Sequence, residues 1–260
     1  MDKKNKIILD ENTLVKAENI SMHFVVPEYK YDTLKEKVIS FLKRKKNFLK
    51  KIEVLDNLSF EIKKGESLGV IGHNGAGKST LLKIVAGIYK PTAGNIATKG
   101  SIVLLNLGAG FDMEADAEEN IYLSGAIMGH SRKEMKERFE SILDFSGLRD
   151  YLKLPLKNYS TGMISRLGFA IAIDVHPNLL LVDEILSVGD ANFQRKCMER
   201  IDQLKKDGVS FLFVSHNIGQ VKSLCEKTLW IEDSKVMAYG NSEEVCDKYL
   251  EYCASNYAKN

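Results

Sequence analysis

The sequence predicts an α/β fold with a mostly parallel core sheet, an antiparallel β edge region and an inserted α-helical subdomain. Continuous apolar runs at 67–71, 178–182 and 209–215 are typical of strands buried on both faces. A helical period extends from Glu118 to Tyr151, between the first two of these runs. Strands that alternate with helices, around a central helical block, indicate a parallel sheet carrying an insertion.

The first part of the chain predicts a strand over 14–26, ending near Phe24 and closed by Pro27. Apolar side chains then recur on one face of an expected helix over 31–51, with lysines on the rest of its surface. Alternation at 58–62 predicts the strand that leads into the run at 67–71.

The later elements follow from the same periodicities. Ser131 with Glu134 forms an expected capping box inside the helical block. Short strands are expected at 95–97 and 101–105, a helix at 161–174, an edge hairpin at 229–232 and 235–239, and a last helix from Ser242 to Tyr252.

Composition excludes several classes of protein. Hydrophobic residues make up 44% of the 260 residues and charged residues 28%, as in a soluble globular protein. The four cysteines are scattered, which indicates a reducing compartment and no zinc site. We expect no signal peptide, because the first twelve residues lack a long apolar core, and no membrane span, because no apolar run approaches 18 residues.

Positive charge is concentrated in one segment. Residues 27–52 hold nine Lys or Arg against three Asp or Glu, a net +6, so the rest of the chain carries −4. A basic amphipathic helix of this kind can lie on an anionic membrane surface or dock on a partner. It can also be a solvated helix packed on its own domain. No aromatic stacking pattern or reading-helix motif supports nucleic-acid binding.

The first motif that indicates a binding site is Gly72-x-x-x-x-Gly77-Lys78-Ser79, which lies between the strand at 67–71 and a following helix. Glycines let main-chain N–H groups turn toward phosphate oxygens at a helix N-terminus. Lys78 can reach the β- and γ-phosphates, and Ser79 can bind Mg²⁺. The pattern predicts a P-loop and therefore a nucleotide site.

Two later strands end in polar residues that suit such a site. Asp183 ends the run at 178–182 and can hold Mg²⁺ through a bound water, while Glu184 can polarise the water that attacks the γ-phosphorus. His216 ends the next strand, where a side chain faces the ligand crevice of an open α/β sheet. Taken alone, Asp183 and Glu184 can also be a surface pair that follows a core strand, and a strand-end histidine such as His216 is more often structural.

Tyr159-Ser160-Thr161-Gly162-Met163 opens the helix expected at 161–174. Ser160 can cap this helix and contact phosphate, and Gly162 allows close approach of the main chain. In isolation the segment is also an ordinary helix N-cap.

Together these motifs resemble the nucleotide-binding subunit of an ATP-binding cassette (ABC) transporter, over about residues 14–250. GHNGAGKST resembles the Walker A loop, LLLVDE the Walker B strand with its catalytic glutamate, and Ser187-Val188-Gly189-Asp190 the D-loop. YSTGM stands where most of the family has LSGGQ. With LGAGFDMEADAEENIYL, DEILSVGDANFQRKC and the early basic insertion, it resembles the ATPases that export O-antigen, teichoic acid and related cell-envelope polysaccharides.

The resemblance implies one nucleotide-binding domain over 1–260 with a P-loop NTPase (RecA-like) core. Its expected parts are a core at about 14–106 and 176–240, a basic insertion at 28–52, a helical subdomain at 107–175 and a C-terminal helix at 242–257. It also implies a set of site residues. Catalysis is assigned to Glu184 and His216. ATP binding is assigned to Phe24, Gly72, His73, Asn74, Gly75, Ala76, Gly77, Lys78, Ser79, Thr80, Asp183, Ser160, Thr161 and Gly162.

The metal is expected to be Mg²⁺, held by Ser79 and Asp183. The family's glutamine near the 106–108 turn is absent, and Asn106 is the nearest amide that can replace it. The resemblance leaves that metal contact open. The chain is also expected to lack the C-terminal carbohydrate-binding domain that some relatives carry.

The implied assembly is a head-to-tail homodimer with two ATP molecules, each bound between one P-loop and the other subunit's Ser160–Gly162 helix end. Two copies of a separate permease would carry a lipid-linked polysaccharide, with the ATPase peripheral on the cytoplasmic face of the cell membrane. Residues 34–52 are candidates for contact with that membrane. A soluble ABC-type ATPase acting on nucleic acid or ribosomes, or an ATPase for another transported substrate, is the competing reading. The absence of a second cassette or a coiled-coil arm counts against a soluble ATPase that acts on nucleic acid or ribosomes. YSTGM and the missing glutamine count against an ATPase for another transported substrate.

Overall fold

The computed structural model describes residues 7–27, 49–105, 110–183 and 190–257. Its strands are β1 (Thr13–Pro27), β2 (Leu49–Lys63), β3 (Ser67–Ile71), β4 (Ala93–Thr98), β5 (Ile102–Leu105), β6 (Leu179–Asp183), β7 (Ser210–Val214), β8 (Lys227–Glu232) and β9 (Lys235–Asn241). Its helices are α2 (Lys78–Val85), α3 (Ala117–Ile127), α4 (Arg132–Ser146), α5 (Thr161–Asp174), α6 (Ala191–Lys206), α7 (Ile218–Leu224) and α8 (Ser242–Tyr257), with short 3₁₀ turns at Arg149–Tyr151 and Leu156–Asn158.

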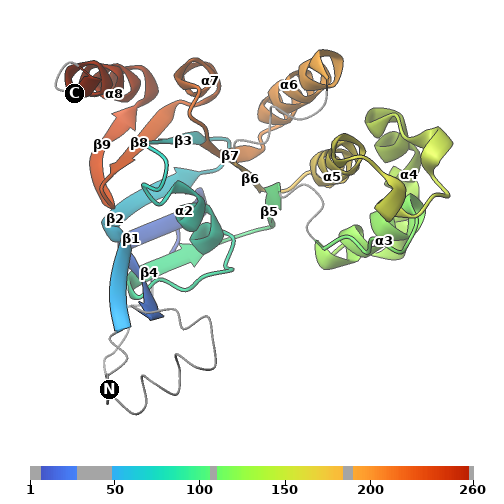
Figure 1. Cartoon of the computed structure of the whole chain (residues 1–260), viewed down its shortest axis with the longest axis horizontal. Helices are drawn as coiled ribbons and strands as arrows, with labels where there is room; N and C mark the ends of the chain where they lie inside the picture. Colours follow the sequence, from blue (N-terminus) through green and yellow to red (C-terminus); the bar gives the residue numbers. More distant parts are fainter. Residues whose placement is uncertain (1–6, 28–48, 106–109, 184–189, 258–260) are drawn as a thin grey trace, which may run out of the picture.

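The strands form two sheets (Figure 1). The larger has the order β5-β6-β7-β3-β8-β9 and is parallel except for the β8–β9 hairpin at its edge. The smaller has the order β2-β1-β4 and is antiparallel. The expected fold class, a mostly parallel sheet with an antiparallel β region, is therefore confirmed.

The central strands of the larger sheet are buried on both faces, as their continuous apolar runs predicted. Leu180 and Val182 of β6 face one hydrophobic core, with α5 and α6, while Leu179 and Leu181 face a second core. Alternation of this kind follows from the two-residue period of a strand. Each strand thus contributes side chains to both cores.

Helix α2 fills the second core, between the two sheets. Its buried side chains Leu81, Leu82, Ile84 and Val85 lie in one cluster with residues of β1, β2 and β3. Burial of an apolar side chain stabilises the folded state by about 1.5–3 kcal/mol. Packing on two sides therefore fixes the direction of α2, and with it the direction of the loop that precedes it.

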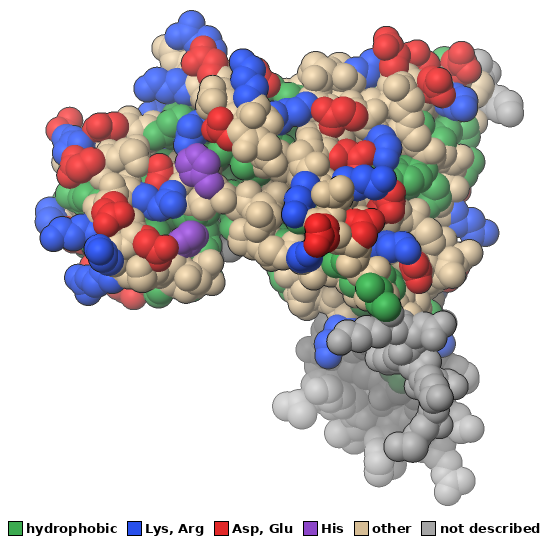
Figure 2. All heavy atoms as spheres, turned by 180° about the vertical axis from the view of Figure 1, so that it is seen from behind, with side chains coloured by type: hydrophobic (Ala, Val, Ile, Leu, Met, Phe, Trp, Pro, Cys, Tyr) green, Lys and Arg blue, Asp and Glu red, His purple; other side chains and the backbone are tan. Residues whose placement is uncertain are grey.

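Helices α3 and α4 form a lobe that projects from the sheets, with α5 between the lobe and β5–β6 (Figure 1). Both lobe helices begin with capping boxes, Asp116 with Glu119 and the expected pair Ser131 with Glu134. Acidic and basic side chains are interspersed over the face of the molecule drawn in Figure 2. In the part of the chain that the structure describes, no helix has the length and apolar character needed to cross a membrane.

The helix expected over 31–51 is wrong at its end. Leu49, Lys50 and Lys51 belong to β2, where they pair with Pro27, Val26 and Val25 of β1. Ile52, which falls at the end of the expected basic insertion at 28–52, also lies in β2 opposite Phe24. The β1–β2 ladder gives these main-chain groups hydrogen-bond partners from a distant segment, which local periodicity does not reveal. The remainder of the expected helix lies outside the described residues.

The helix α6 was not expected from the sequence. Its buried residues Phe193, Cys197, Ile201 and Leu204 have helical spacing, and Asp190 caps it by accepting a hydrogen bond from the Phe193 N–H at 2.9 Å. Many charged residues lie between these apolar positions and mask the pattern. The helical spacing of α6 is therefore present in the sequence, but the charged residues between its apolar positions obscure it.

A buried asparagine generates a prediction about the stability of the lobe. Asn120 on α3 is fully buried, accepts a hydrogen bond from the Asp112 N–H at 2.8 Å and donates to the carbonyls of Asp112 and Asp116. Asn120→Ala removes the acceptor of the Asp112 N–H and the side-chain donor to carbonyls that otherwise keep only the N–H groups of Ala115 and Asn120, which should lower the free energy of unfolding by about 1–3 kcal/mol. Urea denaturation measures the change. Asn158→Ala, at an exposed site of the same lobe, is the control; equal unfolding midpoints for the two variants would contradict the prediction.

Candidate nucleotide site

The loop from Gly72 to Gly77 connects β3 to α2 and requires glycine at both ends. Gly72 has φ +145° and Gly77 has φ +103°. A Cβ atom on Gly72 would lie 1.9 Å from the main-chain oxygen of Ile231, and one on Gly77 would lie 2.5 Å from that of Val54. Backbone angles and close packing therefore exclude any side chain at these two positions.

Lys78 is the first residue of α2 and its side chain is buried. Its Nζ donates to the main-chain oxygens of Gly72 at 2.8 Å and His73 at 2.9 Å. The Ala76 N–H donates to the same His73 oxygen at 3.2 Å, which closes the loop. The ammonium group is thus held inside the loop by the loop's own carbonyls.

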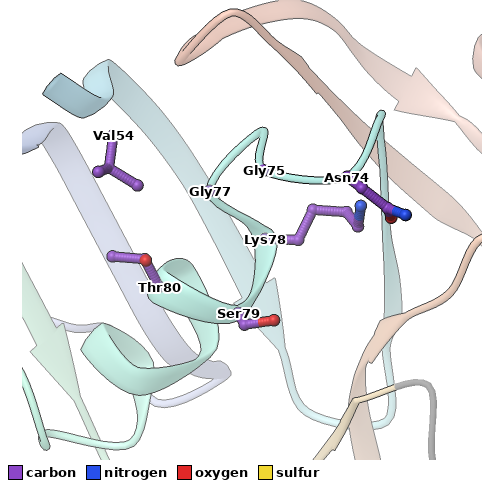
Figure 3. Close-up of a pocket in the computed structure, with 7 residues that line it drawn as sticks. All are labelled: Val54, Asn74, Gly75, Gly77, Lys78, Ser79 and Thr80. Atoms are coloured by element: carbon purple, nitrogen blue, oxygen red, sulfur yellow. The ribbon is translucent and has the colours of Figure 1, made fainter. Parts of the chain in front are cut away.

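The N-terminus of α2 has no side-chain cap, because its N-cap residue is Gly77. Its first N–H groups and the positive end of the helix dipole form an arrangement that binds anions. Beside it lies a cavity of about 230 Å³ lined by Val54, Asn74, Gly75, Gly77, Lys78, Ser79 and Thr80 (Figure 3). His73, Asn74, Gly75 and Ser79 are exposed, whereas Ala76 is buried.

The parallel register brings Asp183 and His216 to the same edge of the sheet as this loop. Val214 of β7 pairs with both Val70 of β3 and Asp183 of β6. Gly72 lies two residues after Val70, and His216 lies two residues after Val214. Adjacent strands lie about 4.8 Å apart, so three neighbouring strands deliver the three polar segments to one crevice.

The residues present suit a magnesium ion. The Ser79 hydroxyl is exposed and lies on the same side of α2 as the Lys78 side chain in Figure 3. Asp183 stands two strands away at the same edge. Mg²⁺ usually keeps several bound waters and needs only one or two protein oxygens. A hydroxyl with a more distant carboxylate suits this coordination. Within the described residues no group of three or more potential metal-binding side chains exists.

Two expected site residues, Glu184 and Asn106, lie outside the described residues. The expected D-loop is described only at Asp190. Its carboxylate accepts a hydrogen bond from the Phe193 N–H and pairs with Arg166 Nη2 at 2.5 Å, which together hold the pKa of Asp190 below its usual range. Arg166 belongs to α5, so this pair joins α5 to the start of α6.

Phe24 lies near the cavity rather than in its lining. Its ring packs edge-on against Tyr89, with centroids 5.7 Å apart. In the β1–β2 ladder it stands opposite Ile52, two residues along β2 from the cavity residue Val54. Stacking of Phe24 on a base stays a prediction.

The segment Ser160–Gly162 lies apart from the loop in the same chain, because α5 and α2 are well separated in Figure 1. Ser160 caps α5 by accepting a hydrogen bond from the Met163 N–H at 3.2 Å, and the first turn holds no acidic residue. Ser160 and Thr161 are exposed, and a Cβ on Gly162 would meet only Ser160 Oγ, at 3.8 Å. This helix end is open, but one chain by itself does not join it to the loop.

The sequence analysis missed two residues that shape the site. Val54 contributes both a lining side chain and the oxygen that excludes a Cβ at Gly77. Glu232, at the end of β8, pairs with the ring of His73 at 2.8 Å. Neither belongs to a sequence motif, and each reaches the loop only through the packing of β2 and β8.

The sequence of this chain is similar to those of known ATP-binding proteins. The profile of the family described as "ABC transporter" matches residues 55–187. An O-antigen export system ATP-binding protein of Klebsiella pneumoniae, RfbB, is 42% identical over 79% of this chain and 84% of its own length. Teichoic acids export ATP-binding proteins, TagH, are 38% identical in Staphylococcus haemolyticus, over 90% of this chain and 89% of the relative, and 37% identical in Bacillus anthracis, over 93% of this chain but 43% of that longer protein.

Solved structures agree on the fold. An ATP-binding subunit of an ABC transporter superimposes with a TM-score of 0.72 at 22% identity, over 91% of this chain and 93% of that one. A dimeric ATP-binding cassette in a post-hydrolysis state, bound to ADP and phosphate, superimposes with a TM-score of 0.70 at 21% identity, over 88% of this chain and 99% of that one.

The loop geometry yields a prediction about glycine. Gly77→Ala places a Cβ against the Val54 carbonyl and should weaken binding of Mg²⁺-ATP by about a hundredfold or more, since the loop must move away from the phosphates. Gly87→Ala is the matched control: Gly87 also has positive φ, at +74°, but nothing lies near its Cβ position. Titration calorimetry should show near-normal affinity for the control. Similar affinities for both variants would contradict the role assigned to the packed loop.

Proposed function

This chain belongs to the ABC transporter family, and from that premise we propose that it is the ATP-hydrolysing subunit of an exporter for a lipid-linked cell-envelope polysaccharide. The observation that carries the ATPase part is the uncapped α2 N-terminus with Lys78 held beneath it, next to the cavity at Ser79. The export part is supported by the identity to O-antigen and teichoic acid export proteins.

In this proposal the loop binds the β- and γ-phosphates through main-chain N–H groups and Lys78. Ser79 and Asp183 would hold Mg²⁺, which would supply positive charge beside the phosphate oxygens. Glu184 orients and polarises the attacking water, and His216 holds that water and the γ-phosphate. The reaction transfers the γ-phosphoryl group to water and leaves ADP and phosphate.

We propose that two copies of the chain complete each site. The open helix end at Ser160–Gly162 cannot serve its own P-loop, from which it is well separated. A head-to-tail partner would bring the Ser160 hydroxyl and the start of α5 to the γ-phosphate, where the helix dipole favours negative charge. ATP then acts as the contact between subunits, and hydrolysis removes it.

The helical lobe is the proposed docking surface for the permease. Exposed apolar side chains gather on it, among them Leu123 and Ile127 on α3, of which Ile127 is 66% exposed, and Tyr151 and Leu154 after α4. The same lobe has a hollow of about 460 Å³ lined by Asp116, Glu118, Glu119, Tyr122, Arg132 and Lys153. Exposed apolar patches that are rimmed by polar residues mark protein–protein interaction sites.

The end of the β1–β2 ribbon is the proposed point of contact with the membrane surface. Val25, Leu49 and Ile52 are 50%, 65% and 44% exposed there, beside exposed Lys50 and Lys51. Apolar side chains next to lysines suit the boundary between anionic headgroups and acyl chains. This placement accords with a peripheral protein on the cytoplasmic face of the membrane, held there by its permease.

Replacing the proposed catalytic carboxylate separates binding from chemistry. Glu184→Gln should bind Mg²⁺-ATP with affinity within about threefold of the unmodified chain and remain dimeric in ATP, because charge near the γ-phosphate falls while the loop is unchanged. Its turnover should fall at least about a hundredfold. Titration calorimetry, size-exclusion chromatography and phosphate release measure the affinity, the dimer and the turnover respectively, and undiminished turnover would remove Glu184 from this role.

Export itself is tested in the organism that carries the chain. Loss of the chain should leave lipid-linked polysaccharide on the cytoplasmic side, and expression of the unmodified chain should restore surface glycan. Lys78→Ala should not restore it, since the variant lacks the phosphate-binding ammonium group. Surface glycan labelling against total glycan measures the outcome. Normal surface glycan without the chain would contradict the export assignment and leave the ATPase assignment standing.

A further inference from the structure

A largely buried carboxylate joins the P-loop to the C-terminal part of the sheet. Glu232 Oε1 lies 2.8 Å from His73 Nδ1, and its side chain is only 12% exposed. Its second oxygen, Oε2, accepts a hydrogen bond from Trp230 Nε1 at 3.1 Å. An ionised carboxylate only accepts, so His73 Nδ1 carries the hydrogen of the first contact.

His73 connects this carboxylate to Lys78. The side chain of His73 contacts Glu232, while its main-chain oxygen accepts from Lys78 Nζ at 2.9 Å. The adjacent Gly72 packs against the main chain of Ile231, the residue before Glu232. The start of the loop is therefore anchored to the end of β8 at two neighbouring points, and both anchored residues hold Lys78.

Glu232 is in turn held from the side of α8. The Trp230 ring packs edge-on against Tyr249 at 5.4 Å and Tyr252 at 5.1 Å between centroids. A carboxylate fixed between an indole N–H and an imidazole has few alternative positions, because motion in either direction breaks a hydrogen bond of a side chain that is itself only 12% exposed.

We propose that Glu232 is a positioning residue for the P-loop: through His73 it fixes the carbonyls that hold Lys78, and Trp230 with α8 holds Glu232 in place. The inference rests on the proposed ATPase function and adds a residue from outside the nucleotide-binding motifs. Its consequence is that nucleotide at the loop and packing at α8 affect each other. Trp230 is the chain's single tryptophan, so its emission reports on that contact.

The test is a double-mutant cycle read out by Mg²⁺-ATP affinity on the full chain. His73→Ala and Glu232→Ala should each raise the Kd about fivefold or more, and the double variant should be no weaker than the weaker single variant, because both remove one contact. Glu66→Ala is the matched control, because Glu66 is 15% exposed and pairs with Lys227 at 2.6 Å. This pair lies where β3 and β8 begin, at the other end of these strands from the P-loop. The control variant should leave the Kd within about twofold.

Tryptophan emission supplies a measurement that a merely structural role would not alter. Mg²⁺-ATP should change the Trp230 emission of the unmodified chain, and His73→Ala at saturating nucleotide should reduce that change to less than about half. His73 is 45% exposed, so this variant tests the contact even if Glu232→Ala does not fold. Additive Kd effects, or an unchanged emission response in His73→Ala, would overturn the proposal. Absence of ATP binding by the unmodified chain would instead overturn the proposed function.

Discussion

The hold of the loop's own carbonyls on Lys78 is the interaction on which the rest of the structure depends. A buried ammonium group is costly unless its donors are satisfied, and the oxygens of Gly72 and His73 satisfy two of them. Those oxygens point inward only because Gly72 and Gly77 adopt backbone angles closed to other residues and pack against β8 and β2. The sheets therefore position the Lys78 ammonium group before any phosphate binds, so that binding does not have to order this side chain.

The parallel sheet extends this constraint to the other proposed site residues. Strands buried on both faces admit no shift of register, since a one-residue slip would move every side chain into the wrong core. Asp183 and the segments leading to Gly72 and His216 are thereby fixed in one row across β6, β7 and β3. A site assembled from segments more than a hundred residues apart in sequence thus depends on packing far from the chemistry.

Residues whose partners are close in sequence could be predicted well. The bounds of β3 and α5 and the capping box at Ser131 follow from local periodicity and capping, and the structure has them as expected. Residues 49–51 could not, because their strand exists only through pairing with β1, and apolar side chains at helical spacing indicated the wrong element. In the site, motifs identified the phosphate-binding loop, but Val54 and Glu232 reach it through tertiary packing that leaves no pattern in sequence.

The central claim is that each chain carries two halves of different ATP sites, one at the P-loop and one at the start of α5. Cysteine cross-linking tests it most directly, using Asn74→Cys and Thr161→Cys, both at exposed positions, in a Glu184→Gln, Cys253→Ser background. The account predicts a disulfide between Cys at 74 of one subunit and Cys at 161 of the other, formed with Mg²⁺-ATP and absent without nucleotide. A chain saturated with ATP that forms no such intersubunit bond would contradict it.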